Sequence, residues 1–279
     1  MKTVTILLSL AALALSIQLT TSPSVASEQL ANCKYLFFLK PLSAEKFTEM
    51  LSAEELEARE ADMKIDAALG FDFRSTEKIL EDREYKSDSK SLQRGLKSKL
   101  GYAKWSEGNT YHGWQTNYRD LANLFTLLKL KPDQKVIDIG SGYGRPGFVI
   151  GLLFPKTQYL GYEIVSERIN IAKQVAAQNG FRNVTFKKQD LSASDFQIEP
   201  ADVYYMYDPI NDKTMRSTMK NIIRANEGRP FSIILHRGGP GDYEKIISEH
   251  AEKVEEITEM GGDYYYKNAY VLFKSKKVD

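Results

Sequence analysis

Three glycines at alternate positions, Gly140, Gly142 and Gly144, form the part of the sequence best suited to bind a ligand. An acid, Asp138, lies two residues ahead of them. Because glycine has no side chain, such a run turns tightly and lets a ligand approach the backbone. Glu163 ends the next apolar segment, nineteen residues after Gly144, where a carboxylate can accept both hydroxyls of a ribose. These residues predict a site for a ligand that contains a nucleoside.

The same loop has the glycine spacing of a dinucleotide site, because Gly147 follows Gly142 and Gly144 at the required distance. An NAD-dependent oxidoreductase is therefore a second interpretation. Two features count against it. Asp138 would meet a cationic or amino group rather than a pyrophosphate, and Pro146 at the helix start lacks the N–H group that a phosphate would use. A ligand with an amino acid head and an adenosine fits these residues better than one with two phosphates.

Alternating helices and apolar strands must position this loop. The first five expected strands alternate with helices, as in a parallel sheet that is covered on both faces, and the last two are expected to be antiparallel. We therefore predict an α/β fold with a doubly wound, mostly parallel seven-stranded sheet of Rossmann-like type and a helical N-terminal extension. The expected strands span residues 135–140, 158–164, 184–190, 202–208, 231–236, 254–258 and 269–273.

Two helices next to this sheet are also expected. Apolar residues on one face predict a helix over 118–129, ahead of the first strand. Ser166 is expected to cap the helix that follows the second strand, which ends near Ala177. The carboxyl ends of the strands, where the glycine loop and Glu163 lie, are the edge at which sheets of this kind bind ligands.

The composition is that of an ordinary globular protein, with 279 residues, 42% hydrophobic and 27% charged. It excludes a disordered chain, and the single cysteine, Cys33, excludes a disulfide scaffold. A formal charge of +1 excludes a protein that coats nucleic acid, and we do not expect a specific nucleic acid as partner.

Six bases against one acid between Lys86 and Lys104 could still attract an anionic partner. Three scattered histidines give no metal-ligand spacing, so no metal is expected.

The first 27 residues predict an export signal. A lone lysine is followed by an apolar run over Val4–Leu19 and by small residues suited to signal peptidase. The alternative is an uncleaved membrane anchor, and contact with a membrane is expected only through this segment. We expect a signal peptide at 1–27, a helical extension at 28–110 and a ligand-binding domain at 111–279. The expected location is periplasmic or secreted, or membrane-anchored if the segment is retained.

The chain resembles the class I S-adenosylmethionine-dependent methyltransferases over residues 110–279. The sequence VIDIGSGYG matches the first motif of that family and LGYEI matches the second. VTFKKQD and DVYYMYDPI match the next two strands. The resemblance implies the methyltransferase version of the Rossmann-like fold, methyl transfer, and S-adenosyl-L-methionine as the small-molecule cofactor. A weaker resemblance, through EIVSER at 163–168, is to the non-SET histone-lysine methyltransferases and their bacterial relatives.

The resemblance also implies which residues contact the cofactor. They come from a segment that covers the cofactor in a subset of these enzymes, residues 111–116, and from the ends of the first three strands. The expected contacts are Thr116 in the covering segment, Asp138, Gly140 and Gly142 beside the methionine part, Glu163 at the ribose, and Asp190 and Leu191 at the adenine.

The methyl acceptor is expected at the end of the fourth strand, where Asp208 and Pro209 emerge. In amine methyltransferases an Asn or Asp followed by Pro offers a side-chain oxygen and a carbonyl to the attacking nitrogen. The resemblance therefore gives Asp208 and Pro209 the catalytic role. Ile210 and Asn211 replace the second proline and the aromatic residue of adenine-methylating enzymes, which disfavours DNA methylation. The alternative is that Asp208 only caps the following helix and Pro209 only makes a turn.

We therefore expect N-methylation of a protein or small-molecule acceptor. His236, after the fifth strand, could serve as a general base or could simply be hydrogen-bonded there. An exported, non-catalytic binding module that reuses the fold is an alternative function, because the cofactor is made in the cytosol. The NAD-dependent oxidoreductase is the other alternative.

Overall fold

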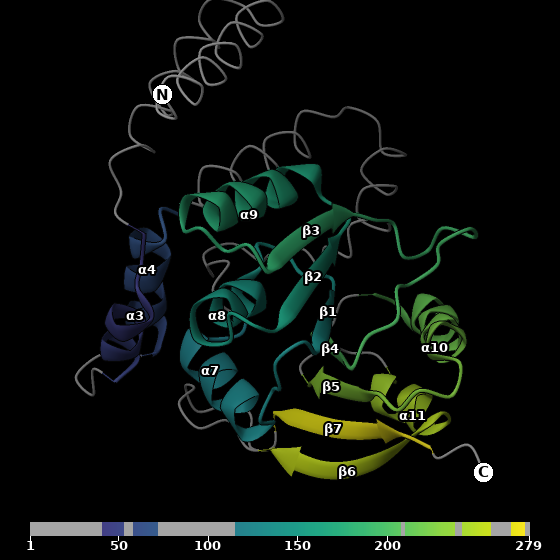
Figure 1. Cartoon of the computed structure of the whole chain (residues 1–279). Helices are drawn as coiled ribbons and strands as arrows, with labels where there is room; N and C mark the ends of the chain where they lie inside the picture. The colour runs from purple at the N-terminus through teal and green to yellow at the C-terminus, as the bar shows by residue number, and fades with distance from the viewer. Residues whose placement is uncertain are drawn as a thin grey trace, which may run out of the picture. The chain divides into compact units, whose positions relative to one another are not determined.

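The expected alternation of helices and strands is present in a computed structural model of the chain (Figure 1). The structure describes residues 41–52, 58–71, 115–207, 210–237, 242–257 and 269–276. Several segments singled out by the sequence lie outside the described residues: the predicted signal segment, Cys33, the basic stretch 86–104, residues 111–114, Asp208 and Pro209.

The helices are α3 (Ala44–Leu51), α4 (Ala58–Ala68), α7 (Tyr118–Leu127), α8 (Arg145–Leu153), α9 (Ser166–Gln178), α10 (Asp212–Asn226) and α11 (Tyr243–Ser248). The strands are β1 (Lys135–Ile139), β2 (Gln158–Glu163), β3 (Val184–Lys188), β4 (Val203–Tyr207), β5 (Ser232–His236), β6 (Ala251–Ile257) and β7 (Tyr270–Ser275).

The strands form one seven-stranded sheet in the order β3-β2-β1-β4-β5-β7-β6. Strands β1 to β5 run parallel, and β7 pairs antiparallel with both β5 and β6. The predicted doubly wound, mostly parallel sheet is confirmed. Strand order reverses between β1 and β4, which places the ligand edge at the carboxyl ends of these two strands.

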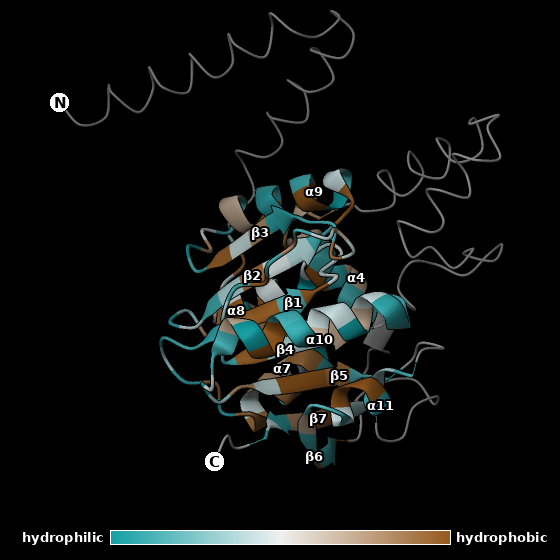
Figure 2. Cartoon of the chain, turned by 90° about the vertical axis from the view of Figure 1, so that its right-hand side faces the viewer, coloured by the Kyte–Doolittle hydropathy of each residue, from teal (hydrophilic) through white to brown (hydrophobic). Residues whose placement is uncertain are grey.

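Each face of the sheet has its own hydrophobic core. Helices α7, α8 and α9 cover one face, and α10 and α11 cover the other (Figure 1). Parallel strands buried on both faces require near-continuous apolar runs, and β1 and β4 are such runs. In Figure 2 the central strands are mostly brown, whereas α10 in front of them shows its teal, polar residues.

Helices α3 and α4 from the N-terminal part pack on the same face as α7, α8 and α9. The ring of Phe47 meets that of Tyr118 edge-on, with centroids 5.9 Å apart. Phe71, just after α4, packs against Tyr143 of the glycine loop at 5.0 Å. Asn179 at the end of α9 accepts from the Leu42 N–H and donates to the Leu69 carbonyl, each at 3.0 Å. The two helices are thus tied to the helices around the glycine loop.

The predicted cap of α9 is wrong. Its N-cap residue is Val165, and Ser166 is already the first helical residue. No side-chain oxygen of the N-cap residue is available, because valine has none. The carboxylate of Glu163 lies at this end of the helix instead and accepts the N–H groups of Ile164 and Val165, each at 2.9 Å. The Glu163 carboxylate thus fixes the two residues that lead into α9, and no side chain caps the first helical N–H groups.

The left-handed backbone at Gly144 gives a first prediction. Gly144 has φ +88°, and an added Cβ would lie 2.4 Å from Cε1 and Cζ of Phe186. We expect Gly144→Ala to lower the free energy of unfolding by about 2–4 kcal/mol, from backbone strain and overpacking together. Gly180 is the matched control, because it has φ +70° and no atom within 4 Å of an added Cβ. Gly180→Ala should cost only about 1–2 kcal/mol in urea denaturation, and equal losses for the two variants would contradict the clash at Phe186.

Candidate active site

The glycine loop lies at the end of β1, where the order of strands reverses. Gly140, Gly142 and Gly144 all have positive φ, at 80°, 53° and 88°. The N–H groups of Gly140 and Ser141 donate to the Tyr162 carbonyl of β2 at 3.0 and 2.8 Å. An added Cβ at Gly142 would meet no atom within 4 Å. The middle of the loop therefore borders open space, as expected of a backbone segment that receives a ligand.

Glu163 binds the loop to the end of β2. Its Oε2 accepts the N–H of Gly142 at 2.9 Å, and its Oε1 accepts the N–H groups of Ile164 and Val165, just before α9. A carboxylate offers about four acceptor positions, so three backbone donors leave about one for a ligand hydroxyl. Gly142 and Glu163 therefore lie side by side, as expected. The carboxylate has about one acceptor position left for a ribose, whereas the sequence predicted that it would accept both ribose hydroxyls.

Asp138 is buried beneath the loop. Its Oδ2 accepts the Tyr159 hydroxyl at 2.6 Å, and its pairing register in the sheet places it between Gly161 of β2 and Tyr205 of β4. Burial raises the pKa of Asp138 to about 7, the Tyr159 hydrogen bond lowers it in part, and the negative charge of Glu163 raises it further. A cation close to this carboxyl would favour its ionised form.

Asp190 and Leu191 follow β3 on the same edge of the sheet. Asp190 Oδ1 accepts from the N–H and hydroxyl of Ser192, at 2.9 and 2.6 Å, in an exposed turn. Leu191 is buried in the core on the α10 face. The turn at Asp190 holds these two residues at the carboxyl end of β3, where the adenine contacts are expected.

Thr116 lies at the ends of β4 and β5. Its hydroxyl is 2.6 Å from the Tyr205 hydroxyl and 3.0 Å from Nδ1 of His236. Thr116 and His236 are both buried, so this hydrogen bonding fixes the plane of the imidazole ring. The structure therefore places Thr116 beside the strand end from which Asp208 and Pro209 emerge.

Three aromatic side chains form a row across the same strand ends. Tyr207 of β4 stacks on His236 of β5, with ring centroids 3.9 Å apart and planes at 27°. His236 in turn meets Tyr270 of β7 at 4.5 Å and 34°. His236 and Tyr270 are buried, whereas Tyr207 is half-buried at the edge of the row. The sequence does not indicate this row, because the row forms only when β4, β5 and β7 are in register.

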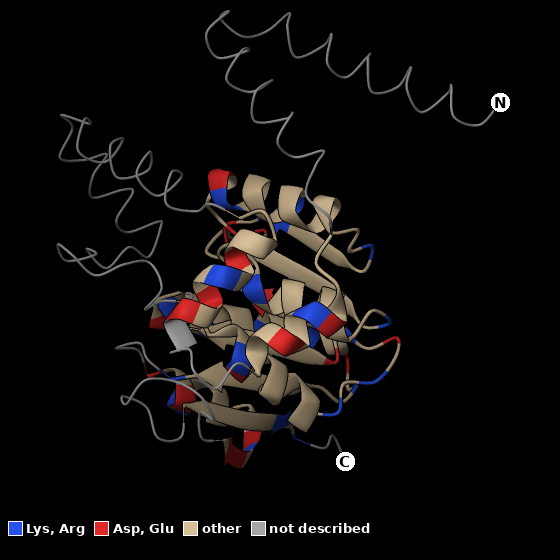
Figure 3. Cartoon of the chain, turned by 90° about the vertical axis from the view of Figure 1, so that its left-hand side faces the viewer, with Lys and Arg blue, Asp and Glu red and all other residues tan. Residues whose placement is uncertain are grey.

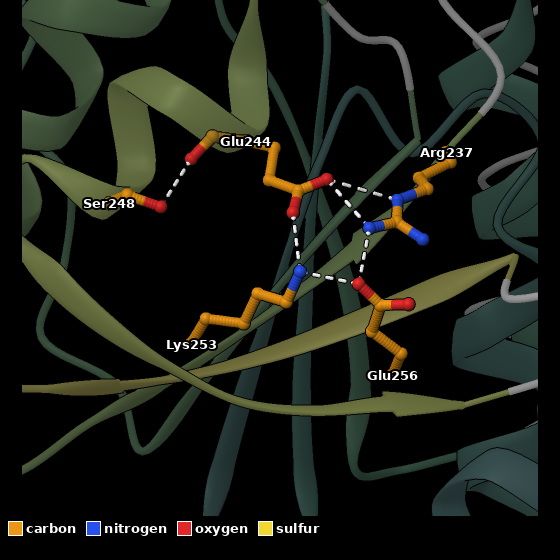
Figure 4. Close-up of polar contacts among 5 residues, drawn as sticks. All are labelled: Arg237, Glu244, Ser248, Lys253 and Glu256. Atoms are coloured by element: carbon orange, nitrogen blue, oxygen red, sulfur yellow. Dashed lines mark hydrogen bonds and ion pairs between the residues drawn. The ribbon is translucent and has the colours of Figure 1, made fainter.

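A surface network of charges supports this edge of the sheet (Figure 4). Arg237, directly after His236, pairs with Glu244 of α11 at 2.8 Å and with Glu256 of β6 at 2.9 Å. Lys253 pairs with the same two carboxylates, so cations and anions alternate around a ring. The Arg237 hydrogen bond, followed by that of Lys253, lowers the pKa of Glu256 to about 2. The network joins the end of β5 to α11 and to the outer strand.

A second charge cluster is fully buried beside the glycine loop. Arg145, the first residue of α8, pairs with Asp62 at 2.8 Å and with Asp66 at 2.6 Å, both from α4. Sequence reasoning missed this cluster. The available signal was the four-residue spacing of two acids beside Ile65 and Leu69, which places acids on the buried side of the helix.

The described residues contain neither a membrane span nor a metal site. Among them no helix is long and apolar enough to cross a membrane. In the same part of the chain, no group of three or more His, Cys, Asp and Glu side chains is arranged to hold a metal ion.

Comparison with known proteins decides between the possible ligands of this edge. Residues 130–267 match the model of a family described as a methyltransferase domain. The chain belongs to the class I S-adenosylmethionine-dependent methyltransferases. Its cofactor is therefore S-adenosyl-L-methionine, and methyl transfer replaces the oxidoreductase and the non-catalytic module as its activity. When bound, this cofactor supplies an electrophilic methyl group on a sulfonium. The open glycine loop and the acceptor left on Glu163 fit such a molecule.

The methyltransferase has relatives whose names include a substrate. Ribosomal RNA small subunit methyltransferase G of Bacteroides thetaiotaomicron is 24% identical over 152 residues, which are 53% of this chain and 71% of the relative. The protein of the same name from Acidothermus cellulolyticus is 44% identical over 68 residues, or 24% of this chain and 31% of the relative. Among solved structures, an S-adenosylmethionine-dependent O-methyltransferase of Thermotoga maritima has a TM-score of 0.46 and 17% identity, covering 59% of this chain and 67% of that one.

One expectation about this methyltransferase is wrong. The near-zero net charge argued against a specific nucleic-acid partner, yet the relatives are named as RNA methyltransferases. The physical reason is that net charge sums over the whole surface, whereas binding of one RNA region depends on the charges that face it. A neutral sum excludes a protein that coats nucleic acid, and it does not exclude an enzyme that acts on one nucleotide.

The hydrogen bonds of Glu163 give a prediction for cofactor binding. Glu163→Gln replaces one acceptor oxygen with an NH₂ group that faces backbone N–H donors, so the loop loses part of its anchorage. We expect the dissociation constant of S-adenosylhomocysteine to rise about 10- to 100-fold, because the loss of charge-assisted hydrogen bonds weakens binding by about 1.5–3 kcal/mol. Titration calorimetry measures this. Glu252→Gln, at an exposed position of β6, is the control. Unchanged affinity in Glu163→Gln would remove Glu163 from the cofactor site.

Proposed function

We propose that the protein methylates a base nitrogen in a structured RNA, with S-adenosyl-L-methionine as methyl donor. The observation that carries the proposal is the relationship to ribosomal RNA small subunit methyltransferases, which extends over about half of this chain. The family model matches residues 130–267, which include the strand ends proposed to contact both cofactor and acceptor.

The aromatic row at the ends of β4, β5 and β7 supports an acceptor with a planar ring. Tyr207 is its half-buried outer member, and His236 and Tyr270 hold it from behind. Proteins bind unpaired bases by stacking them on aromatic side chains, and a row of fixed rings loses little side-chain entropy when a base arrives. Asp208 and Pro209 follow Tyr207 directly, so an oxygen acceptor for a base N–H group is available in the adjacent residues.

Charge in the N-terminal part is also consistent with an RNA partner. The stretch 86–104 has six bases and one acid and lies outside the described residues. Lysine and arginine contacts to phosphates supply much of the affinity of RNA-binding proteins and make it dependent on salt. We propose that this stretch contacts the RNA backbone while the base is held at the sheet edge.

Transfer of a radiolabelled methyl group tests the acceptor. Purified protein, labelled S-adenosylmethionine and transcribed small-subunit ribosomal RNA should give label that ribonuclease releases and protease does not. Parallel reactions with a protein extract and with its dialysable fraction test the amine acceptors that the sequence suggested. Label that appears only in those reactions would overturn the RNA proposal and leave the methyltransferase assignment standing.

Tyr207 provides a prediction for the acceptor side. Tyr207→Ala should lower kcat/KM for the RNA about 5- to 100-fold, since stacking of a base on an aromatic ring contributes about 1–3 kcal/mol. Tyr207→Phe retains the ring and should retain most of the activity. The dissociation constant of S-adenosylhomocysteine should change in neither variant. If Tyr207→Ala methylates RNA as well as the unaltered protein, the base does not stack on this ring.

The predicted export segment determines where this reaction can take place. RNA and cofactor are both cytosolic. We therefore propose that the segment anchors the chain with its enzyme domain in the cytosol, or that the exported chain is delivered into another cell. N-terminal sequencing of the protein from cell fractions distinguishes these routes. Met1 in the membrane fraction supports anchoring, and a start near Glu28 in the medium supports delivery. A protein found only in the periplasm would contradict an RNA acceptor.

A further inference from the structure

Arg145 is a buried cation at the junction between the glycine loop and α8. Its side chain is 1% exposed, and it follows Gly144 directly. Its two terminal nitrogens pair with Asp62 and Asp66, and the guanidinium lies over the ring of Tyr118, 4.9 Å from the centroid. Its Nε has no hydrogen-bond partner among the described residues. The residue that follows the loop, Arg145, is thus fixed by two carboxylates and an aromatic ring.

The two carboxylates of α4 also hold the start of α7. Asp62 Oδ1 accepts the backbone N–H of Tyr118 at 2.9 Å, and Asp66 Oδ1 accepts its hydroxyl at 2.8 Å. Each carboxylate therefore binds Arg145 with one oxygen and Tyr118 with the other. Thr116, which contacts His236 on the acceptor side, is only two residues from Tyr118. The cluster connects α4 to the cofactor loop and to the segment that leads to the acceptor side.

Stability alone does not account for such a cluster. Removing three charges from water is costly, and replacement of a buried ion triad by apolar residues of similar size is often neutral or stabilising. Burial raises the pKa of Asp62 to about 6, against the opposing effect of Arg145, which shows how poorly the site is solvated. Elsewhere on this side of the molecule, charges of both signs are interspersed at the surface (Figure 3). A role in positioning the residues that it contacts would account for a buried charge cluster at a site where apolar side chains could serve.

We propose that Arg145, Asp62 and Asp66 are positioning residues that hold the glycine loop in its cofactor-binding conformation before the cofactor arrives. The loop needs such support because its three glycines have positive φ and little side-chain packing of their own. The cluster acts on the loop from its carboxyl end, as Glu163 acts on its middle through Gly142. Helix α4 is then part of the cofactor-binding unit. The inference concerns cofactor binding and does not depend on the acceptor.

A triple variant separates positioning from stability. Asp62→Leu, Asp66→Leu and Arg145→Met together replace the charges with apolar side chains of similar size. We expect a folded protein with a modestly lower melting temperature, because removal of the ion triad itself is nearly neutral and Tyr118 loses its two hydrogen bonds to the carboxylates. We also expect the dissociation constant of S-adenosylhomocysteine to rise about 10-fold or more, because the loop is no longer preorganised. Hydrogen exchange at the amides of Gly140, Ser141 and Gly144 should speed up at the same time. A triple variant that is stable and binds S-adenosylhomocysteine with unchanged affinity would overturn the proposal.

Arg145→Lys keeps the test falsifiable if the triple variant does not fold. A lysine keeps the charge but lacks the planar fork that spans two carboxylates. We expect a folded protein whose affinity for S-adenosylhomocysteine lies between those of the unaltered protein and the triple variant. Glu60→Gln is the matched control on the same helix, since Glu60 forms an exposed ion pair with Lys64, and it should change neither quantity. A lower melting temperature in Arg145→Lys with unchanged affinity would assign the cluster to stability alone.

Discussion

Arg145→Met alone should destabilise the protein by about 3–5 kcal/mol, because it leaves Asp62 and Asp66 buried without their cation. Both carboxyl groups are nearly inaccessible to water. The remaining partner, Tyr118, supplies one N–H and one hydroxyl, which do not neutralise two negative charges. A loss of this size in a domain of this length lowers the melting temperature by roughly 10 °C. Urea denaturation at pH 8 measures it directly.

Two comparisons support the interpretation of this loss. Arg216→Met removes an exposed arginine that pairs with Glu249 at the surface, and its free energy of unfolding should stay close to that of the unaltered protein. The deficit of Arg145→Met should also shrink at pH 5, since protonation neutralises the unpaired carboxylates. A deficit that is equal at pH 5 and pH 8, or absent at both, would show that the carboxylates do not depend on Arg145.

Asp138→Asn should stabilise the ligand-free protein at high pH. Burial raises the pKa of Asp138 to about 7 from an ordinary value of 3.8, so the folded state binds the proton more tightly than the unfolded state. The free energy of unfolding therefore falls as pH rises between about 4 and 7, by up to about 4 kcal/mol for three pKa units. Asparagine cannot ionise and still offers an oxygen to the Tyr159 hydroxyl. The variant should exceed the unaltered protein by about 2–4 kcal/mol at pH 8 and match it near pH 4.

The difference between the two proteins isolates Asp138 from other groups. The pKa of Asp62 is also raised, to about 6, so the unaltered protein loses stability in the same range for a second reason. That second contribution is common to both proteins and cancels in the difference. Asp195→Asn, at an exposed position, is the control for the substitution of a carboxylate by an amide. A difference that is constant from pH 4 to pH 8 would contradict the raised pKa of Asp138.

The sequence predicts the five parallel strands to within about two residues at each end, because each is an apolar run bounded by turns. It places the start of β6 three residues late, at Val254 instead of Ala251. This outer strand is exposed between its end residues and has charges at 252, 253, 255 and 256, so it lacks the apolar signal. Edge strands that are protected by charge are difficult to recognise by hydrophobic pattern.

The site is predicted unevenly for a related reason. Gly142 and Glu163 are recognisable because their spacing repeats across a family, and the structure joins them by a hydrogen bond. The Arg145 cluster is not recognisable from the sequence, because its carboxylates come from a helix some eighty residues earlier. Charged residues are also rarely fully buried, so burial of these three is not expected. Long-range pairs of this kind depend on how α4 packs on α8. Local patterns contain no information on that packing.

The acceptor shows a third limit. Composition summarises the whole chain, and a formal charge of +1 led to the wrong expectation about nucleic acid. The relationship to ribosomal RNA methyltransferases corrects it. The structural feature that bears on the acceptor, the row formed by Tyr207, His236 and Tyr270, arises from strand register and has no counterpart in composition.

The central claim is that S-adenosylmethionine binds at the glycine loop between the ends of β1 and β2. The most direct measurement is a titration of isotope-labelled protein with S-adenosylhomocysteine, followed by amide NMR spectra. The amide signals of Gly140, Ser141 and Gly142 should shift and saturate together with those of Ile164 and Val165 at the Glu163 carboxylate. If these amides do not respond at millimolar ligand, or if only amides elsewhere in the chain respond, the cofactor does not bind at this edge of the sheet.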